Sequence, residues 1–369
     1  MKKRLLLPLL LGLLLGCALP FGSVPERPVE VSQTDVSAPT ATPAVEVLTL
    51  EGKGTTQPEE APIKVPETPP PSEAPLPSET PMPPPSEAPR FYEKFAHGET
   101  VLTEDCYRTE TVAIFLSHVE DASKTFVKGP LVYHVADIYL ADATTLRSAF
   151  THEDFRYKYI APMRELAASN NAVLAISGDY IRHRKLGLCA RNGVVYRDTP
   201  DPKRDAAAMY RDGTMAVFDA TDTPAGELTA DPNVWHLIGF GPSLLDAEGQ
   251  PKTAFHTDVA GINPRAAIGY YEPGHYCFVL VEGRQDKYSL GLTMEGLSKL
   301  MASLGCKSAF NLDGGNTASM YFNGALVNSD RTAPREVHDI FYIPLQTDGG
   351  AQDAPAETDD PQKSGAPLP

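Results

Sequence analysis

Residues 309–320 read AFNLDGGNTASM: a short apolar run ends in an acid and then opens into two glycines and a polar cluster. An apolar run of this length is typical of a buried strand, and glycines let the backbone turn sharply or approach a ligand closely. At the end of such a strand the carboxylate of Asp313 is well placed for chemistry. The alternative is a tight turn that Asp313 caps, and this stretch alone does not separate the two.

Two other segments repeat this arrangement of an apolar strand, a glycine and an acid. Asp179 follows the apolar run 171–177 by way of a glycine, and Glu282 follows the run 276–281 just before another glycine. A local turn explains each acid alone, but three of them at strand ends favour a common site. Converging acids suit glycosyl or phosphoryl chemistry, and three acids close together also suit a calcium site.

Two arginines stand beside the same strand ends. Arg265 precedes the apolar run 266–269, and Arg284 lies two residues after Glu282. A guanidinium group at a strand entrance can bind an oxyanion through two parallel hydrogen bonds. Most isolated arginines are surface residues, so these two point to an anionic ligand only in combination with the acids.

Strand signals recur through the folded part of the chain. Asn-Gly or Asp-Gly pairs between apolar runs predict hairpins at 187–196, 207–218 and 321–327. Further strands are expected at 171–177, 266–269, 276–281 and 337–344.

Only two segments have the features of helices. Thr293 is a suitable N-cap for a helix that continues to Leu304 and stops at Gly305. The second candidate, 162–169, begins with a proline. Many strands and few helices predict an α+β fold with a mixed or antiparallel sheet core and a few packed helices.

The first 19 residues have the composition of a secretory signal peptide. Three basic residues precede an almost unbroken apolar run, and the sequence LLGC at 14–17 resembles a bacterial lipobox. In a lipoprotein Cys17 would carry the lipid, whereas an ordinary signal peptide or an uncleaved anchor gives it no such role. Each alternative predicts an extracytoplasmic domain on the bacterial cell surface, anchored to the cell membrane or secreted through it, without a second spanning segment.

The segments on either side of the folded domain have compositions that do not support a packed core. Residues 20–89 hold 18 of the 35 prolines, and the sequence PPPSEAP occurs twice among them. Such segments bury too little apolar surface to fold. We therefore expect a disordered Pro-rich linker (20–90), a folded region (91–346) of one large domain or two closely merged ones, and a disordered acidic tail (347–369).

Charge and cysteine usage exclude several function classes. The formal net charge is −16 and the chain has one Trp, so nucleic-acid binding is disfavoured. No GxSxG, HExxH, Walker loop or EF-hand sequence occurs. The cysteines after Cys17 include no CxxC pair, which disfavours a zinc knuckle, and they suit disulfides and buried free thiols equally.

Six short motifs follow one another along the folded part of the chain. They are Asp179-Tyr180, Arg191-Asn192-Gly193, Gly239-Phe240-Gly241-Pro242, NPRAAIG at 263–269, Glu282-Gly283-Arg284-Gln285 and NLDGG at 311–315. Each motif alone is weak, but the ordered set is fairly specific, and over roughly residues 100–345 the chain resembles the phosphodiester glycosidase family.

Three positions depart from the family pattern. Ser177 replaces the usual Asn before Gly-Asp-Tyr, Glu282 replaces an Asp, and Asn316-Thr317 replaces a common Gly-Ser. Ser177 and Thr317 keep hydrogen-bonding capacity and Glu282 keeps its charge. These changes bear on substrate identity more than on reaction type.

The resemblance implies a hydrolase that acts on a carbohydrate phosphodiester. For this reaction we hypothesise that Asp179 and Asp313 are the carboxylates near the anomeric carbon, and that Glu282 orients an arginine or a metal. The predicted substrate-binding residues are Arg265 and Arg284 for the phosphate, Gly314 and Gly315 beside them, and Asn311 and Thr317 for sugar hydroxyls or for holding the loop.

No cofactor follows from these motifs, although a divalent cation such as Ca²⁺ fits three converging acids. The expected partners are the glycan phosphodiester, on cell-wall or exopolysaccharide material, and the membrane through the N-terminal anchor. Two alternatives remain: a non-catalytic glycan- or phosphate-binding module, and a metal-dependent phosphoesterase.

Overall fold

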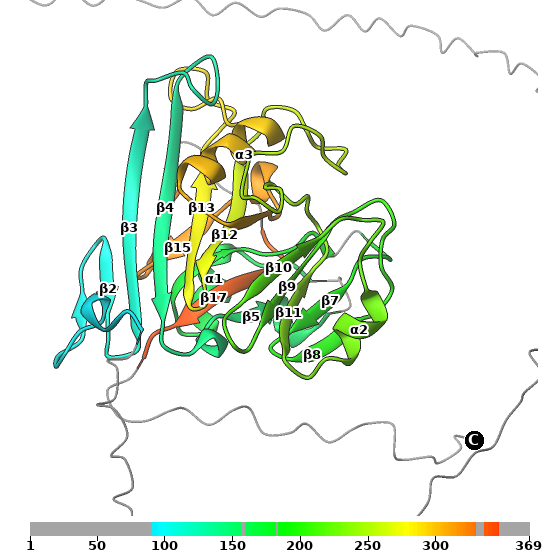
Figure 1. The fold of residues 1–369 in the computed structure, drawn as a ribbon. Coiled ribbons are helices and arrows are strands. Elements are labelled where there is room, and N and C mark those ends of the chain that lie inside the picture. The colour runs from blue at the N-terminus through cyan, green and yellow to red at the C-terminus, as the bar shows by residue number, and fades with distance from the viewer. Residues whose placement is uncertain (1–89, 156–158, 182–183, 330–335, 347–369) are drawn as a thin grey trace, which may run out of the picture. The chain divides into compact units, whose positions relative to one another are not determined.

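The computed structural model describes residues 90–155, 159–181, 184–329 and 336–346 (Figure 1). The predicted signal segment with Cys17, the linker up to residue 89 and the acidic tail 347–369 lie outside these residues. No helix in the described part of the chain has the length and apolar character of a membrane-spanning segment.

Three antiparallel sheets make up most of the described chain. Sheet 1 has the strand order β1-β2-β3-β4-β13-β12-β14: β1 Val101–Leu102, β2 Cys106–Arg108, β3 Val112–Asp121, β4 Leu131–Leu140, β13 His275–Val281, β12 Arg265–Glu272 and β14 Ser308–Asn311. Sheet 2 has the order β10-β9-β11-β7-β8: β10 Met215–Phe218, β9 Ala206–Tyr210, β11 Val234–Ile238, β7 Cys189–Arg191 and β8 Val194–Arg197. Sheet 3 has the order β16-β15-β6-β17-β5: β16 Ala325–Leu326, β15 Met320–Phe322, β6 Ala172–Ser177, β17 Asp339–Pro344 and β5 Arg147–Phe150.

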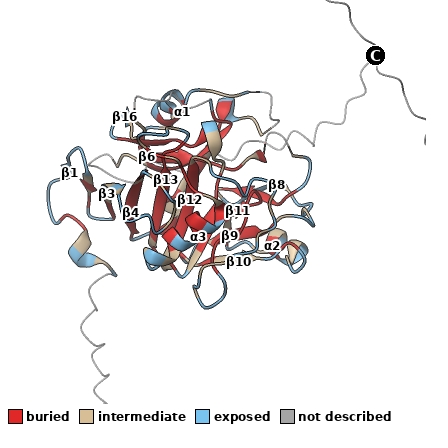
Figure 2. Ribbon diagram, turned by 90° about the horizontal axis from the view of Figure 1, so that it is seen from above, coloured by how far each residue is buried: buried red, intermediate tan, exposed pale blue. Residues whose placement is uncertain are grey.

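One hydrophobic core is shared by all three sheets, because alternate residues of each strand point to the same side. Phe278 and Ile268 of sheet 1, Met209 of sheet 2 and Phe341 of sheet 3 belong to this cluster. Figure 2 shows the central strands β12 and β13 in the colour of buried residues. The three sheets therefore form one packed unit.

The outer face of each sheet is covered by one short helix. The helix α1 (Met163–Ser169) packs on sheet 3, α2 (Ala225–Ala230) on sheet 2 and α3 (Met294–Ser303) on sheet 1. Leu297, Leu300 and Met301 of α3 are fully buried, as their helical spacing predicts. The expected cap is present as well, since the Gly296 N–H donates to Thr293 Oγ1 at 3.0 Å.

The fold confirms the expected α+β class, and the sheets are antiparallel rather than mixed. The predicted hairpins correspond to β7–β8, β9–β10 and β15–β16, each paired in antiparallel register. Two long paired strands, β3 and β4, were not expected from the sequence. The four cysteines of the described region are free thiols: Cys106, Cys189, Cys277 and Cys306.

Candidate functional site

The ends of β6, β12 and β14 meet through backbone hydrogen bonds. The Asp313 N–H donates to the Gly178 carbonyl at 2.9 Å, and Ser177 Oγ donates to the Asp313 carbonyl at 2.9 Å. On the other side of β14, the Leu312 N–H donates to the Ala266 carbonyl at 2.8 Å. The neighbours in sequence of Asp179 and Arg265 are thus bonded to the segment that carries Asp313.

Gly314 and Gly315 let this segment pack closely on residues 263–265. A Cβ atom on Gly314 would lie 2.9 Å from the Pro264 carbonyl oxygen, a separation that side chains do not tolerate. The Gly315 N–H donates to the same carbonyl at 2.9 Å, and its φ of 62° is accessible mainly to glycine. The two glycines therefore bring the backbone after Asp313 onto the entrance of β12.

Asn311 and Thr317 are buried on either side of this turn. The Asn311 Nδ2 atom donates to the Gly241 carbonyl at 2.8 Å, and its backbone N–H donates to the Pro242 carbonyl at 3.0 Å. Thr317 lies in a short 3-10 helix, Gly315–Thr317, and its N–H donates to the Gly314 carbonyl at 3.1 Å. These bonds hold the turn in place, and the predicted contact of Asn311 and Thr317 with the substrate stays a prediction.

Asp179 lies in a buried ionic cluster with Arg191 and Asp339. The Arg191 Nη2 atom is 3.1 Å from Asp339 Oδ2 and 3.5 Å from Asp179 Oδ2, and both acids are almost fully buried. The Gly239 N–H also donates to Asp179 Oδ2 at 2.8 Å. Asp179 therefore holds the end of β6 against β7 and β17, and its predicted catalytic role stays a prediction.

The Asp339 carboxyl group is packed tightly against the turn that leads into Asp179. A Cβ on Gly178 would lie 2.5 Å from Asp339 Oδ2, so this turn requires glycine for lack of space. Burial raises the pKa of Asp339, Arg191 opposes the rise and the nearby Asp179 adds to it. The cluster holds two acids and one base, so Arg191 is essential to its charge balance.

Glu282 shares the strand edge with Arg265 but lies on the opposite face of sheet 1. Arg265 is paired with Val281, and Glu282 is the next residue, so its side chain points the other way. Its Oε1 atom accepts the Ser329 N–H at 2.6 Å and lies 3.6 Å from His134 Nε2. The contacts of Glu282 are thus with a backbone N–H and a histidine, and its predicted function of orienting an arginine or a metal stays a prediction.

Arg265 and Arg284 are both held by neutral oxygens. The Arg265 guanidinium donates to the backbone carbonyls of Leu292 and Val259, each at 2.9 Å, and to that of Gly261. Arg284 donates to Asn263 Oδ1 at 2.7 Å and to Asn316 Oδ1. Burial, together with the nearby Arg284 charge, lowers the pKa of Arg265 to about 10.

The solvent-facing part of the site is formed by the turn itself. Asp313, Gly314 and Gly315 are half-buried, and Asn316 and Arg284 are exposed. Asp313 is thus the one of the three predicted catalytic acids that a ligand can approach from solvent.

One group of side chains has the donor atoms of a metal site, but a lysine already lies within it. Asp205, Asp219 and His256 bring ligand atoms within 4.8 Å of one another. The Lys252 ammonium is 3.0 Å from Asp219 Oδ1 and 3.7 Å from Asp205 Oδ2, and His256 Nδ1 is 2.7 Å from Asp205 Oδ1. These contacts balance the negative charge without an ion, so the group does not support a metal.

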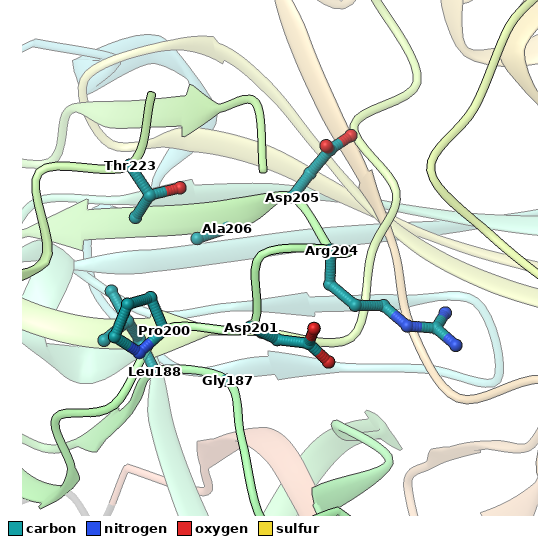
Figure 3. Close-up of a pocket in the computed structure, with 9 residues that line it drawn as sticks. Gly187, Leu188, Pro200, Asp201, Arg204, Asp205, Ala206 and Thr223 are labelled. Atoms are coloured by element: carbon teal, nitrogen blue, oxygen red, sulfur yellow. The ribbon is translucent and has the colours of Figure 1, made fainter. Parts of the chain in front are cut away.

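Sequence reasoning missed several charged residues near Asp179. Arg191 stands in a motif that was recognised, but no role was assigned to it, and Asp339 had no signal beyond its place in an apolar run. Arg184 and Arg204 were also missed. Arg204 lines a small hollow with Gly239 and Asp201, and Figure 3 shows the charged ends of Asp201 and Arg204 directed to the same side, away from Pro200 and Leu188.

A family model and a curated protein match this chain in sequence. Residues 170–344 match the sequence model of the family described as phosphodiester glycosidase. The chain is 28% identical over 273 residues to the SPbeta prophage-derived uncharacterized protein YomE of Bacillus subtilis, a match that covers 66% of this chain and 40% of that protein. The chain thus spans well under half the length of this relative.

Two solved structures match this chain. The catalytic domain of zebrafish N-acetylglucosamine-1-phosphodiester alpha-N-acetylglucosaminidase, auto-inhibited by its pro-peptide, superimposes with a TM-score of 0.51 at 20% identity, over 64% of this chain and 83% of that one. A hypothetical protein from Synechocystis gives a TM-score of 0.47 at 16% identity, over 63% of this chain and 62% of that one. The matched region contains every predicted site residue from Asp179 to Thr317, so the expected resemblance of residues 170–344 to the phosphodiester glycosidase family is confirmed.

Proposed function

We propose that this chain is an extracytoplasmic hydrolase that cleaves sugar-1-phosphodiesters, on cell-wall or exopolysaccharide glycans. The observation that carries the proposal is the pair of arginines next to the turn that follows Asp313. Among the described residues, neither Arg265 nor Arg284 has a carboxylate partner.

The charge of this pair favours an anionic ligand. With a pKa of about 10, Arg265 is protonated at neutral pH although its side chain is buried. Backbone carbonyls orient such a cation but do not neutralise it, and a buried charge is unfavourable unless an opposite charge pairs with it. A phosphodiester bound at the exposed Arg284 supplies that charge next to Asp313.

The chemistry of the substrate explains why arginines and few acids suffice. When the bond between the anomeric carbon and a phosphate oxygen breaks, the leaving phosphate monoester has a pKa near ~6 and departs without much protonation. The site then needs charge stabilisation on the phosphate and a carboxylate for the developing oxocarbenium ion or for water. Arg284 and Arg265 serve the first need, and Asp313 the second.

Asp179 has a positioning role in the proposed reaction. Its own contacts are to Arg191 and Gly239, and its neighbour Gly178 bonds the Asp313 backbone. In this proposal Asp179 fixes the position of Asp313 and adds negative charge below the anomeric carbon.

The test is a screen of sugar-1-phosphodiesters with the full chain in water labelled with heavy oxygen, with and without a chelator. We expect release of free sugar that carries the label, because the C–O bond breaks. Label in the phosphate instead would show P–O scission and favour a phosphoesterase. Release of sugar from none of the diesters would favour a non-catalytic binding module.

The extracytoplasmic and membrane-anchored location is proposed from the N-terminal sequence. Expression of the full chain in bacteria, followed by separation of membrane and soluble fractions, tests it. We expect Cys17→Ser to move the protein out of the membrane fraction if Cys17 is lipidated. Retention of the variant in membranes would favour an uncleaved anchor instead.

A further inference from the structure

A second pair of arginines flanks Phe240, next to Asp179. The Arg184 guanidinium carbon lies 4.7 Å from the centre of the Phe240 ring and 5.7 Å from that of Tyr180. The Arg204 guanidinium carbon lies 6.0 Å from the centre of the same Phe240 ring. We propose that Arg184 and Arg204 form a second anion-binding subsite, which takes a phosphate group that the substrate carries beyond the one at the scissile bond. This inference rests on the proposed function.

Each of these arginines has a buried donor that is not used within the described residues. The Nη1 atoms of Arg184 and Arg204 are shielded from solvent, and no described residue accepts a hydrogen bond from either. Leaving a charged donor buried and unpaired is unfavourable. Two such donors around one aromatic ring are therefore a stronger indication of a ligand than either would be alone.

A third arginine shows how a structural arginine differs from this pair. Arg197 donates from Nη1 to the Arg184 carbonyl at 2.8 Å and from Nε to the Gly187 carbonyl. It thereby fixes the backbone from which Arg184 extends. Burial and the nearby Arg204 charge lower the pKa of Arg184, and the carboxylates of Asp179, Asp201 and Asp258 oppose this shift in part. The fold thus holds two guanidinium groups near each other.

The carboxylate of Asp258 occupies part of the proposed subsite. Its Oδ1 atom lies 2.6 Å from Arg204 Nη2, but the Asp258 side chain is 75% exposed. An ion pair with so exposed a carboxylate contributes at most about a fivefold preference. A substrate phosphate, which offers more acceptor oxygens and equal or greater charge, displaces it readily.

The segment that carries Asp258 joins the two arginine pairs. Asp258 pairs with Arg204, and the carbonyls of the next residue, Val259, and of Gly261 accept hydrogen bonds from Arg265. The two pairs are thus neighbours across one short loop. A glycan with successive phosphodiester links presents two phosphates in this way, whereas an isolated sugar phosphodiester fills the Arg284 site alone.

The test has a binding part and a kinetic part. Phosphorus NMR titration of the full chain with inorganic phosphate measures binding without turnover. We expect two phosphate sites in the wild type. One of these sites should be lost in the double variant Arg184→Met/Arg204→Met and should be partly retained in the single variant Arg204→Lys. Asp258→Asn should bind phosphate about two- to fivefold more tightly, whereas Asp198→Asn, an exposed acid bonded to Thr199, should not differ from the wild type.

The kinetic part compares a substrate with one phosphodiester and a substrate with two in succession. The double arginine variant should raise KM for the second substrate about ten- to hundredfold, with kcat and the one-phosphate substrate unaffected. An unchanged titration and an unchanged KM in a folded variant would overturn the subsite while the proposed function stands. If neither substrate is cleaved by the wild type, the proposed function fails, and the phosphate titration alone decides the subsite.

Discussion

Replacing Arg191 by methionine tests whether the buried cluster behind Asp313 is held together by charge. The Arg191 side chain is 1% exposed and its Nη2 atom contacts both Asp339 and Asp179. Its Nη1 atom also donates to the Leu237 carbonyl at 2.5 Å. Methionine fills much of the volume but leaves two buried carboxyl groups without a base.

We expect Arg191→Met to lower the free energy of unfolding by about 3–5 kcal/mol, because the loss of one partner of a buried ion pair leaves charge uncompensated. Denaturant unfolding at about pH 7.5, followed by far-UV circular dichroism, measures the difference. Arg211→Met is the matched control. Arg211 is exposed and stacks on Trp235 with its guanidinium carbon 4.5 Å from the ring centre, so its loss should be below about 1 kcal/mol.

The sign of the pH dependence follows from Asp339. Burial raises its folded pKa above the ordinary value of 3.8, so its contribution to stability is complete below that value and is lost as pH rises through the folded pKa. Without Arg191, which opposes the rise, the folded pKa increases further and the protonated form persists to higher pH. The deficit of Arg191→Met should therefore be smaller at about pH 5 than at about pH 7.5.

Two results would refute this reasoning. A deficit below about 1 kcal/mol at about pH 7.5 would mean that the cluster is not an ionic unit. A deficit of equal size at both pH values would mean that packing, rather than the unpaired carboxyl groups, accounts for the loss.

Three further predictions concern the turn, the proposed catalytic acid and the thiols. Gly178→Ala should destabilise the fold by about 1–3 kcal/mol because its Cβ meets the Asp339 carboxylate, whereas Gly226→Ala in α2, where a Cβ meets nothing within 4 Å, should be neutral or slightly stabilising in the same denaturant assay. Asp313→Asn should lower kcat for sugar-1-phosphodiesters by at least about a hundredfold with little change in unfolding midpoint, and turnover retained in a folded variant would remove Asp313 from the catalytic role. Cys277 and Cys306, whose buried sulfur atoms are 3.8 Å apart, should be linked by the thiol oxidant diamide, which peptide mapping detects, and two separate free thiols after oxidation would contradict this.

The hairpins and the helix α3 were predictable because their signals are local. Asn192-Gly193, Asp212-Gly213 and Asn323-Gly324 each join two adjacent strands, and Thr293 caps α3. The β3–β4 pair was missed because its two strands are joined by residues 122–130, a connection too long for a two-residue turn signal. Local sequence identifies a turn only when the turn is short.

The sequence predicted the site residues that lie at the ends of single strands, but not the contacts between distant segments. The sequence placed Asp179, Arg265 and Asp313 at such ends, and backbone hydrogen bonds join their neighbours. It did not reveal that Asp339 is the partner of Arg191, because 148 residues separate the two. Arg191 lies in β7 of sheet 2 and Asp339 in β17 of sheet 3, so their contact depends on how the two sheets pack, which no local pattern encodes.

The arginines around Asp313 and Asp179 differ in which groups balance their charge. This difference distinguishes arginines that stabilise the fold from those proposed to bind a ligand. Arg191 has two buried carboxylates as partners, so its charge is balanced inside the fold and a ligand adds nothing to it. Among the described residues, Arg265 and Arg284 contact only neutral oxygens, and Arg204 pairs only with an exposed aspartate. A fold that holds cations without buried counter-charges loses stability by doing so, and in the proposed function an anionic substrate restores the balance when it binds. We therefore place the proposed catalytic surface where positive charge is left unbalanced, rather than where acids and bases are most densely paired.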